Sequence, residues 1–123
     1  MARGPETLLV GKIGRAITKA WPTAWAIKIQ GGPYQTAGVP DLLVVVEGLL
    51  VGIEVKARRN GESREHAFGR VTLRQWGTIE ALRRAGAFAG PALSVEESMA
   101  IVSHRLGLLD SSNADLTRDN LRR

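Results

Sequence analysis

The chain has 123 residues, a formal net charge of +5 and no cysteine. This length suits one domain with its own core. The lack of cysteine excludes a disulfide framework and a Cys-type zinc site, and it agrees with a cytoplasmic location. The most apolar stretch, residues 42–53, is interrupted by Glu47 and Gly48, so we expect neither a signal peptide nor a membrane span.

The excess positive charge lies in one stretch. Residues 56–84 contain eight lysines and arginines and three glutamates, so this segment carries a net charge of +5 and the rest of the chain is neutral overall. A basic surface favours a polyanionic partner such as DNA, although a solvated loop and helix face is the alternative. The candidate DNA-binding residues are Lys28, Arg58, Arg59, Arg64, Arg70 and Arg74.

The first half of the chain predicts a helix followed by three strands. Pro5 suits the first turn of a helix, and apolar residues then recur at helical spacing. Glu47-Gly48 is a tight turn signal between two β-branched runs, which indicates a hairpin. The expected elements are a helix over residues 5–20, a strand over 25–29, a Gly-rich loop over 31–39, and strands over 42–46 and 49–55.

The second half predicts two capped helices around a short strand. Thr72-x-x-Gln75 and Ser94-x-x-Glu97 each have the form of a capping box. We expect a polar, irregular loop over residues 58–70, a helix over 72–85, an edge strand within 88–93 and a last helix over 94–106. This order indicates an α/β fold with a mixed sheet of about four strands and helices on both faces, formed by residues 1–109, with a polar tail over 110–123.

The hairpin places two carboxylates opposite each other. With Glu47 and Gly48 as the turn, Val46 pairs with Leu49, and the same register sets Asp41 opposite Glu54. Directly opposed side chains share one face of a sheet, with Cβ atoms about 5 Å apart. Lys56 follows Glu54 by two residues and therefore lies on that face too.

Opposed carboxylates repel each other, and a divalent cation would relieve that repulsion. Their hard oxygen atoms suit Mg²⁺ or Mn²⁺. Such an ion polarises a phosphoryl oxygen and lowers the pKa of a bound water, while Lys56 is suited to orient the water or offset charge on the phosphate. These are the groups that hydrolysis of a phosphodiester requires.

Two further residues lie on the buried faces of their predicted helices, and each has two interpretations. Glu6 either joins the carboxylate pair or simply complements the helix dipole in the first turn. Gln75 either reaches the same site or serves only the capping box.

Together these segments resemble a known enzyme superfamily. Gly38-Val39-Pro40-Asp41, the apolar hairpin, Glu54-Val55-Lys56 and Thr72-x-x-Gln75 are similar to the PD-(D/E)XK nucleases, and within them to the VRR-NUC (virus-type replication-repair nuclease) family. The resemblance extends over about residues 6–90. It implies a three-layer α/β/α, restriction-endonuclease-like fold for residues 1–109.

The resemblance also implies roles. Asp41, Glu54 and the Val55 carbonyl would bind Mg²⁺, with Mn²⁺ as a substitute, and Glu6 would add a helix-borne ligand. Lys56 and Gln75 would complete the catalytic set. The implied activity is a homodimeric, structure-selective DNA endonuclease of the Holliday-junction-resolvase or flap type, active in repair or recombination. The alternatives are a sequence-specific, restriction-like endonuclease and a DNA-binding module without turnover.

Overall fold

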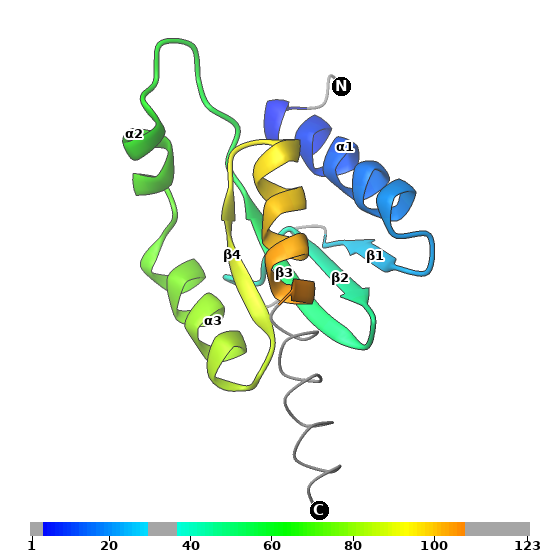
Figure 1. Cartoon of the computed structure of the whole chain (residues 1–123). Helices are drawn as coiled ribbons and strands as arrows, with labels where there is room; N and C mark the ends of the chain where they lie inside the picture. Colours follow the sequence, from blue (N-terminus) through cyan, green and yellow to red (C-terminus); the bar gives the residue numbers. More distant parts are fainter. Residues whose placement is uncertain (1–3, 30–36, 108–123) are drawn as a thin grey trace, which may run out of the picture.

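The structure is a computed structural model that describes residues 4–29 and 37–107 (Figure 1). Its elements follow the order helix, three strands, two helices, strand and helix. They are α1 (Pro5–Ala20), β1 (Trp25–Lys28), β2 (Leu42–Val46), β3 (Leu49–Val55), α2 (Arg64–Gly69), α3 (Leu73–Arg84), β4 (Phe88–Ala92) and a last helix over residues 95–107. The predicted α/β organisation is confirmed.

The sheet has four strands in the order β1-β2-β3-β4. β1, β2 and β3 are antiparallel neighbours, and β4 joins β3 in parallel, so the sheet is mixed as expected. Val46 pairs with Leu49, which confirms the predicted register of the hairpin. Glu47 and Gly48 have φ angles of 51° and 77°, as a two-residue turn with both central residues in the left-handed region requires.

Helices pack on both faces of the sheet. The larger cluster of buried apolar residues joins α1 and the last helix to alternate residues of β2 and β3. It includes Ile13 of α1, Val44 of β2, Ile53 of β3 and Val102 of the last helix. Figure 1 shows α1 and the last helix over this face. The smaller cluster, built around Ile79, joins α3 to β4 on the other face. The polar side chains of the carboxyl end of β3 therefore face the α3 side.

The prediction of a loop over residues 58–70 is partly wrong, because the second half of this segment forms α2. Ser63 caps this short helix by accepting a hydrogen bond from the His66 backbone N–H at 3.1 Å, and Ala67 on its inner face is fully buried. The segment is so rich in charged residues that its sequence indicates neither the Ser63 cap nor the buried position of Ala67.

The predicted capping box at Thr72-x-x-Gln75 is complete, whereas the one at Ser94-x-x-Glu97 forms only one of its two hydrogen bonds. Thr72 and Gln75 form both hydrogen bonds of the capping box at the start of α3. Ser94 accepts from the Glu97 backbone N–H at 3.1 Å, while the Glu97 carboxylate accepts from the Leu93 backbone N–H. The predicted loop over 31–39 lies largely, and the tail over 110–123 entirely, outside the described residues. None of the helices in the described ranges has the length and apolar character needed to cross a membrane.

Gly52 is expected to be a sensitive point of the sheet. A Cβ added there would meet Pro40 Cγ at 3.1 Å and Leu82 Cδ1 at 3.3 Å. Gly52→Ala should therefore destabilise the fold by about 1–3 kcal/mol through overpacking. Gly77→Ala is the control, since its Cβ would enter open space on α3 and should stabilise the helix by about 1 kcal/mol. Urea denaturation of both variants tests this, and equal stabilisation by the two alanines would contradict it.

Candidate active site

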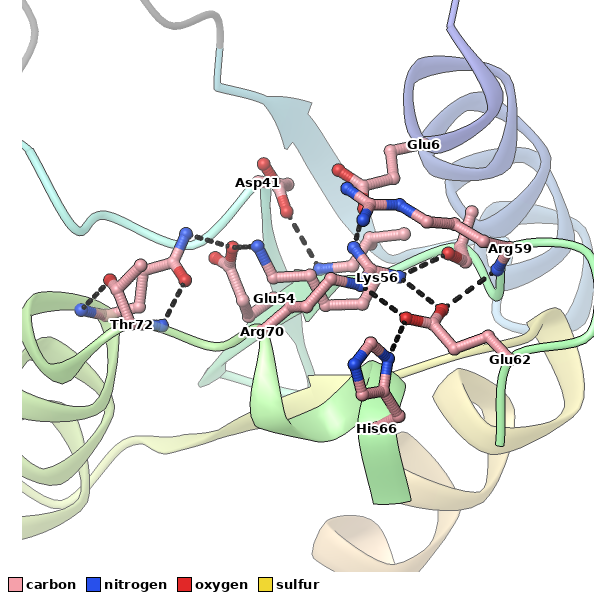
Figure 2. A network of polar contacts seen from close by, with 12 residues as sticks. Glu6, Asp41, Glu54, Lys56, Arg59, Glu62, His66, Arg70 and Thr72 are labelled. Carbon is pink, nitrogen blue, oxygen red and sulfur yellow. Dashed lines mark hydrogen bonds and ion pairs between the residues drawn. The ribbon is translucent and has the colours of Figure 1, made fainter. Parts of the chain in front are cut away.

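Asp41 lies immediately before β2, where two main-chain contacts fix its position. Its carbonyl accepts a hydrogen bond from Ile29 N–H at 2.8 Å, and its Oδ2 accepts from Val55 N–H at 2.8 Å. The hairpin register, continued by one residue beyond Leu42 and Ile53, sets Asp41 opposite Glu54. Figure 2 shows the two carboxylates side by side at the end of the hairpin, as the sequence predicts.

Glu54 is almost completely buried, with 2% of its surface exposed. Its Oε1 accepts a hydrogen bond from Gln75 Nε2 at 2.6 Å and lies 3.7 Å from Lys56 Nζ. Its Oε2 is buried and makes no hydrogen bond to the described residues. The structure thus brings Asp41, Glu54, Lys56 and Gln75 into one site, with one carboxylate oxygen lacking a partner.

The environment of the pair disfavours its full negative charge. Burial, followed by the charge of Asp41, raises the pKa of Glu54 to about 8, and Lys56 opposes this shift only in part. Burial also raises the pKa of Asp41, against the hydrogen bond from Val55 N–H. A group that supplies positive charge between the two carboxylates would restore their ionised forms.

The donor set fits a hard divalent cation. The orphaned Glu54 Oε2 and the Asp41 carboxylate supply two oxygens. The Val55 carbonyl, the third ligand that the family resemblance implies, follows Glu54 directly at the end of β3. These three groups would therefore hold the ion, with water completing its coordination. No trio of His, Asp or Glu side chains within residues 4–29 and 37–107 gathers closely enough to form a metal site without main-chain oxygen.

Gln75 fulfils both of the roles considered for it. Its Oε1 accepts from the Thr72 backbone N–H at 2.9 Å in the capping box, and its Nε2 donates to Glu54. Because the oxygen is already occupied by the helix cap, the amide group is held with its nitrogen toward the carboxylate. The local cap therefore orients a side chain of the site.

Glu6 lies at the edge of the site rather than within the pair. It comes from the first turn of α1, and its charge is near enough to raise the pKa of Asp41. Its Oε1 accepts from Arg70 Nη1 at 3.1 Å (Figure 2). The structure thus gives Glu6 a cationic partner in the chain and does not gather it with Asp41 and Glu54 as a third ligand.

Two arginines expected at the DNA surface make contacts within the chain. Arg70 hydrogen-bonds to Glu62, Glu6 and the Ala57 carbonyl and is 17% exposed. Arg64 forms an ion pair with Glu97 of the last helix and lies over the Phe68 ring.

The other four candidate cations are exposed, but they do not all face the site. Arg58 and Arg59 lie on the loop directly after β3, and Arg74 lies at the start of α3. Lys28 pairs with Leu42, so it lies on the α1 face of the sheet, opposite to Glu54. There it borders a groove with Arg15 and Thr18 of α1.

Glu62 is a buried acid to which the sequence pattern assigns no role. This carboxylate is only 4% exposed and accepts hydrogen bonds from the side chains of Arg70 and His66 and from the Arg59 backbone N–H. Arg70, followed by Arg59 N–H, holds the pKa of Glu62 well below its usual range. The only indication of this role in the sequence is that Glu62 is an acidic residue within a strongly basic segment.

Comparisons with known proteins bear on the fold. No family model matches the chain, and no curated protein matches its sequence. A solved structure named "VRR_NUC domain" is 21% identical, has a TM-score of 0.50, and aligns over 77% of this chain and 95% of its own length. A second, named "VRR_NUC domain protein", is 18% identical with a TM-score of 0.48, over 84% and 89% of the two chains. The likeness to the first of these structures shows that the chain has the fold of the VRR_NUC domain.

Proposed function

We propose that this protein is a metal-dependent DNA endonuclease that hydrolyses phosphodiester bonds in branched DNA, such as four-way junctions or flaps. The observation that carries the proposal is the buried Asp41–Glu54 pair with Lys56 Nζ 3.7 Å from Glu54 Oε1. The fold shared with a structure named "VRR_NUC domain" supports it, because that name denotes a nuclease domain. The net charge of +5 on residues 56–84 supports a nucleic-acid substrate.

Each residue of the site has a distinct proposed task. Asp41, Glu54 and the Val55 carbonyl would hold Mg²⁺ or Mn²⁺, and the bound ion would supply Lewis acidity. Lys56 is 11% exposed, so its ammonium meets the substrate in a poorly hydrated place where a charge acts strongly. It orients the attacking water and offsets negative charge on the phosphate. Gln75 holds Glu54 in its orientation.

The resolution of a four-way junction requires more than one active site. A single active site cuts one strand, so symmetric cleavage of a four-way junction calls for two copies related by a twofold axis. We therefore propose a homodimer as the resolving form. A flap requires one incision and can be cut by a monomer.

The assay compares a labelled four-way junction, a flap and a linear duplex of one sequence, with Mg²⁺, Mn²⁺ or EDTA. We expect metal-dependent cleavage of at least one branched substrate at a rate well above that of the duplex. A defined cleavage ladder on the duplex would instead indicate a sequence-specific enzyme. Binding without cleavage in either metal would indicate a DNA-binding module, and either outcome would contradict the proposal.

Gln75→Ala is expected to lower the cleavage rate by about 10–100-fold, the usual effect of removing a residue that orients a metal ligand. Thr72→Ala is the matched control. It removes the cap hydroxyl of the same helix, which costs about 1 kcal/mol of stability, but it leaves the Gln75 contact with Glu54. Cleavage rates and melting temperatures are measured together. Equal losses of rate in the two variants would show that Gln75 acts only as a helix cap.

A further inference from the structure

Glu62 is the centre of the loop that follows β3. Its backbone N–H donates to the Arg59 carbonyl at 2.9 Å, and its own carbonyl accepts from Arg58 Nε at 3.1 Å and Nη2 at 2.7 Å. Its carboxylate accepts from Arg59 N–H at 2.9 Å and from His66 Nδ1 at 2.6 Å. All the polar groups of this residue are thus used to shape the segment of residues 57–63.

Arg70 ties this loop to two other parts of the protein. Its Nε and Nη2 donate to the two Glu62 oxygens, each at 2.9 Å, and Nη2 also donates to the Ala57 carbonyl at 2.7 Å. Its Nη1 reaches Glu6 at the start of α1 (Figure 2). Only a planar guanidinium can make this set of contacts, because a lysine presents one nitrogen.

The segments that Arg70 joins form the two walls of a groove beside the active site. The groove has a volume of about 350 Å³ and is lined by residues 4–7 on one wall and by Ala57, Arg58 and Arg59 on the other. Within the described part of the chain, the Arg59 guanidinium forms no ion pair. Its charge is therefore available to a phosphate group.

We propose that Glu62 and Arg70 form a brace that fixes the loop of residues 57–63 against α1 and thereby positions Arg58 and Arg59 for the DNA backbone. This inference rests on the proposed function for the identity of the ligand. Both members of the brace are positioning residues, and Arg70 acts through the loop rather than by contact with DNA. A rigid loop loses less conformational entropy when it binds, so the brace raises affinity.

The test exploits the sign of a charge change. Glu62→Gln and Glu65→Gln each remove one negative charge, and Glu65 is exposed on α2 with no hydrogen bond to the described residues. If only net charge matters, both variants bind DNA more tightly. The brace predicts that Glu62→Gln binds a labelled branched DNA about tenfold more weakly than Glu65→Gln, because charge-assisted hydrogen bonds are lost. Affinity is measured by fluorescence anisotropy in Ca²⁺ at fixed salt.

Arg70→Lys separates positioning from direct contact. It keeps the positive charge, so a residue that merely touches phosphate should retain most of its affinity. The brace predicts a loss comparable to that of Glu62→Gln. Affinity close to that of the wild type in both Arg70→Lys and Glu62→Gln would overturn the inference.

Limited trypsin digestion tests the brace independently of DNA. We expect cleavage after Arg58 and Arg59 to be several-fold faster in Glu62→Gln than in Glu65→Gln, because the loop opens more often. Unchanged cleavage would refute the brace even if the protein binds DNA. Faster cleavage in a protein that fails to bind any DNA would refute the proposed function and leave the brace as a structural device without that role.

Discussion

Asp41→Asn is expected to reduce the single-turnover rate of DNA cleavage by about 10²–10³-fold, the scale found when one preorganised electrostatic group is removed from an active site. Asparagine retains an oxygen that can accept from Val55 N–H, so the local main chain should keep its position. What it loses is the negative charge that would hold the divalent ion. The measurement is cleavage of a labelled branched DNA with the protein in excess and saturating Mg²⁺.

Two controls separate this effect from unfolding and from loss of binding. Without added metal, the melting temperature should be no lower than that of the wild type, because asparagine removes the charge that repels Glu54. The affinity for DNA in Ca²⁺ should stay close to that of the wild type. Glu65→Gln, which removes a carboxylate from the surface of α2, should retain full activity. An Asp41→Asn variant that cuts within a few-fold of the wild-type rate would exclude Asp41 from the catalytic site.

Glu54→Gln is expected to abolish cleavage and yet to stabilise the metal-free protein. The pKa of Glu54 is raised from 4.5 to about 8, so the folded chain holds this proton more tightly than the unfolded chain does. Ionisation therefore destabilises the fold progressively as pH rises from about 4.5 to about 8. Glutamine removes the charge while its oxygen can still accept from Gln75. A gain of about 1 kcal/mol would raise the melting temperature by about 4–8 °C in a domain of this size.

The melting temperature of both proteins is measured in EDTA at pH 5 and at pH 8. We expect the wild type to lose stability relative to Glu54→Gln between the two values, and Mg²⁺ at pH 8 to restore the wild type alone. A variant less stable than the wild type at pH 8 without metal would show that the buried carboxylate is well accommodated. That result would contradict a cation site between Asp41 and Glu54.

The central part of the fold could be predicted because local chemistry determines it. The Glu47-Gly48 turn sets the register of the hairpin, and that register, continued by one residue, places Asp41 opposite Glu54. In the same way, the Thr72-x-x-Gln75 box both begins α3 and orients the Gln75 amide. In each case the residues that decide the structure are within a few positions of one another.

The parts that could not be predicted depend on contacts between distant segments. Arg70 and Glu6 are 64 residues apart, and nothing in their neighbourhood reveals the bond between them. Lys28 was expected near DNA, but the pairing of β1 with β2 decides its face, and the long connection between these strands left that register open. Charge counts cannot separate a cation that faces solvent from one with a carboxylate partner, as Arg64 and Glu97 demonstrate.

The most direct test of the central claim is a single cleavage experiment started by addition of Mn²⁺ to a preformed complex of protein and labelled four-way junction or flap. The proposed site predicts a rapid burst of product with the wild type, suppression by EDTA, and no burst with Asp41→Asn or Glu54→Gln. The absence of product with the wild type, or equal product with both variants, would contradict the assignment of Asp41 and Glu54 as the metal-binding centre of a nuclease.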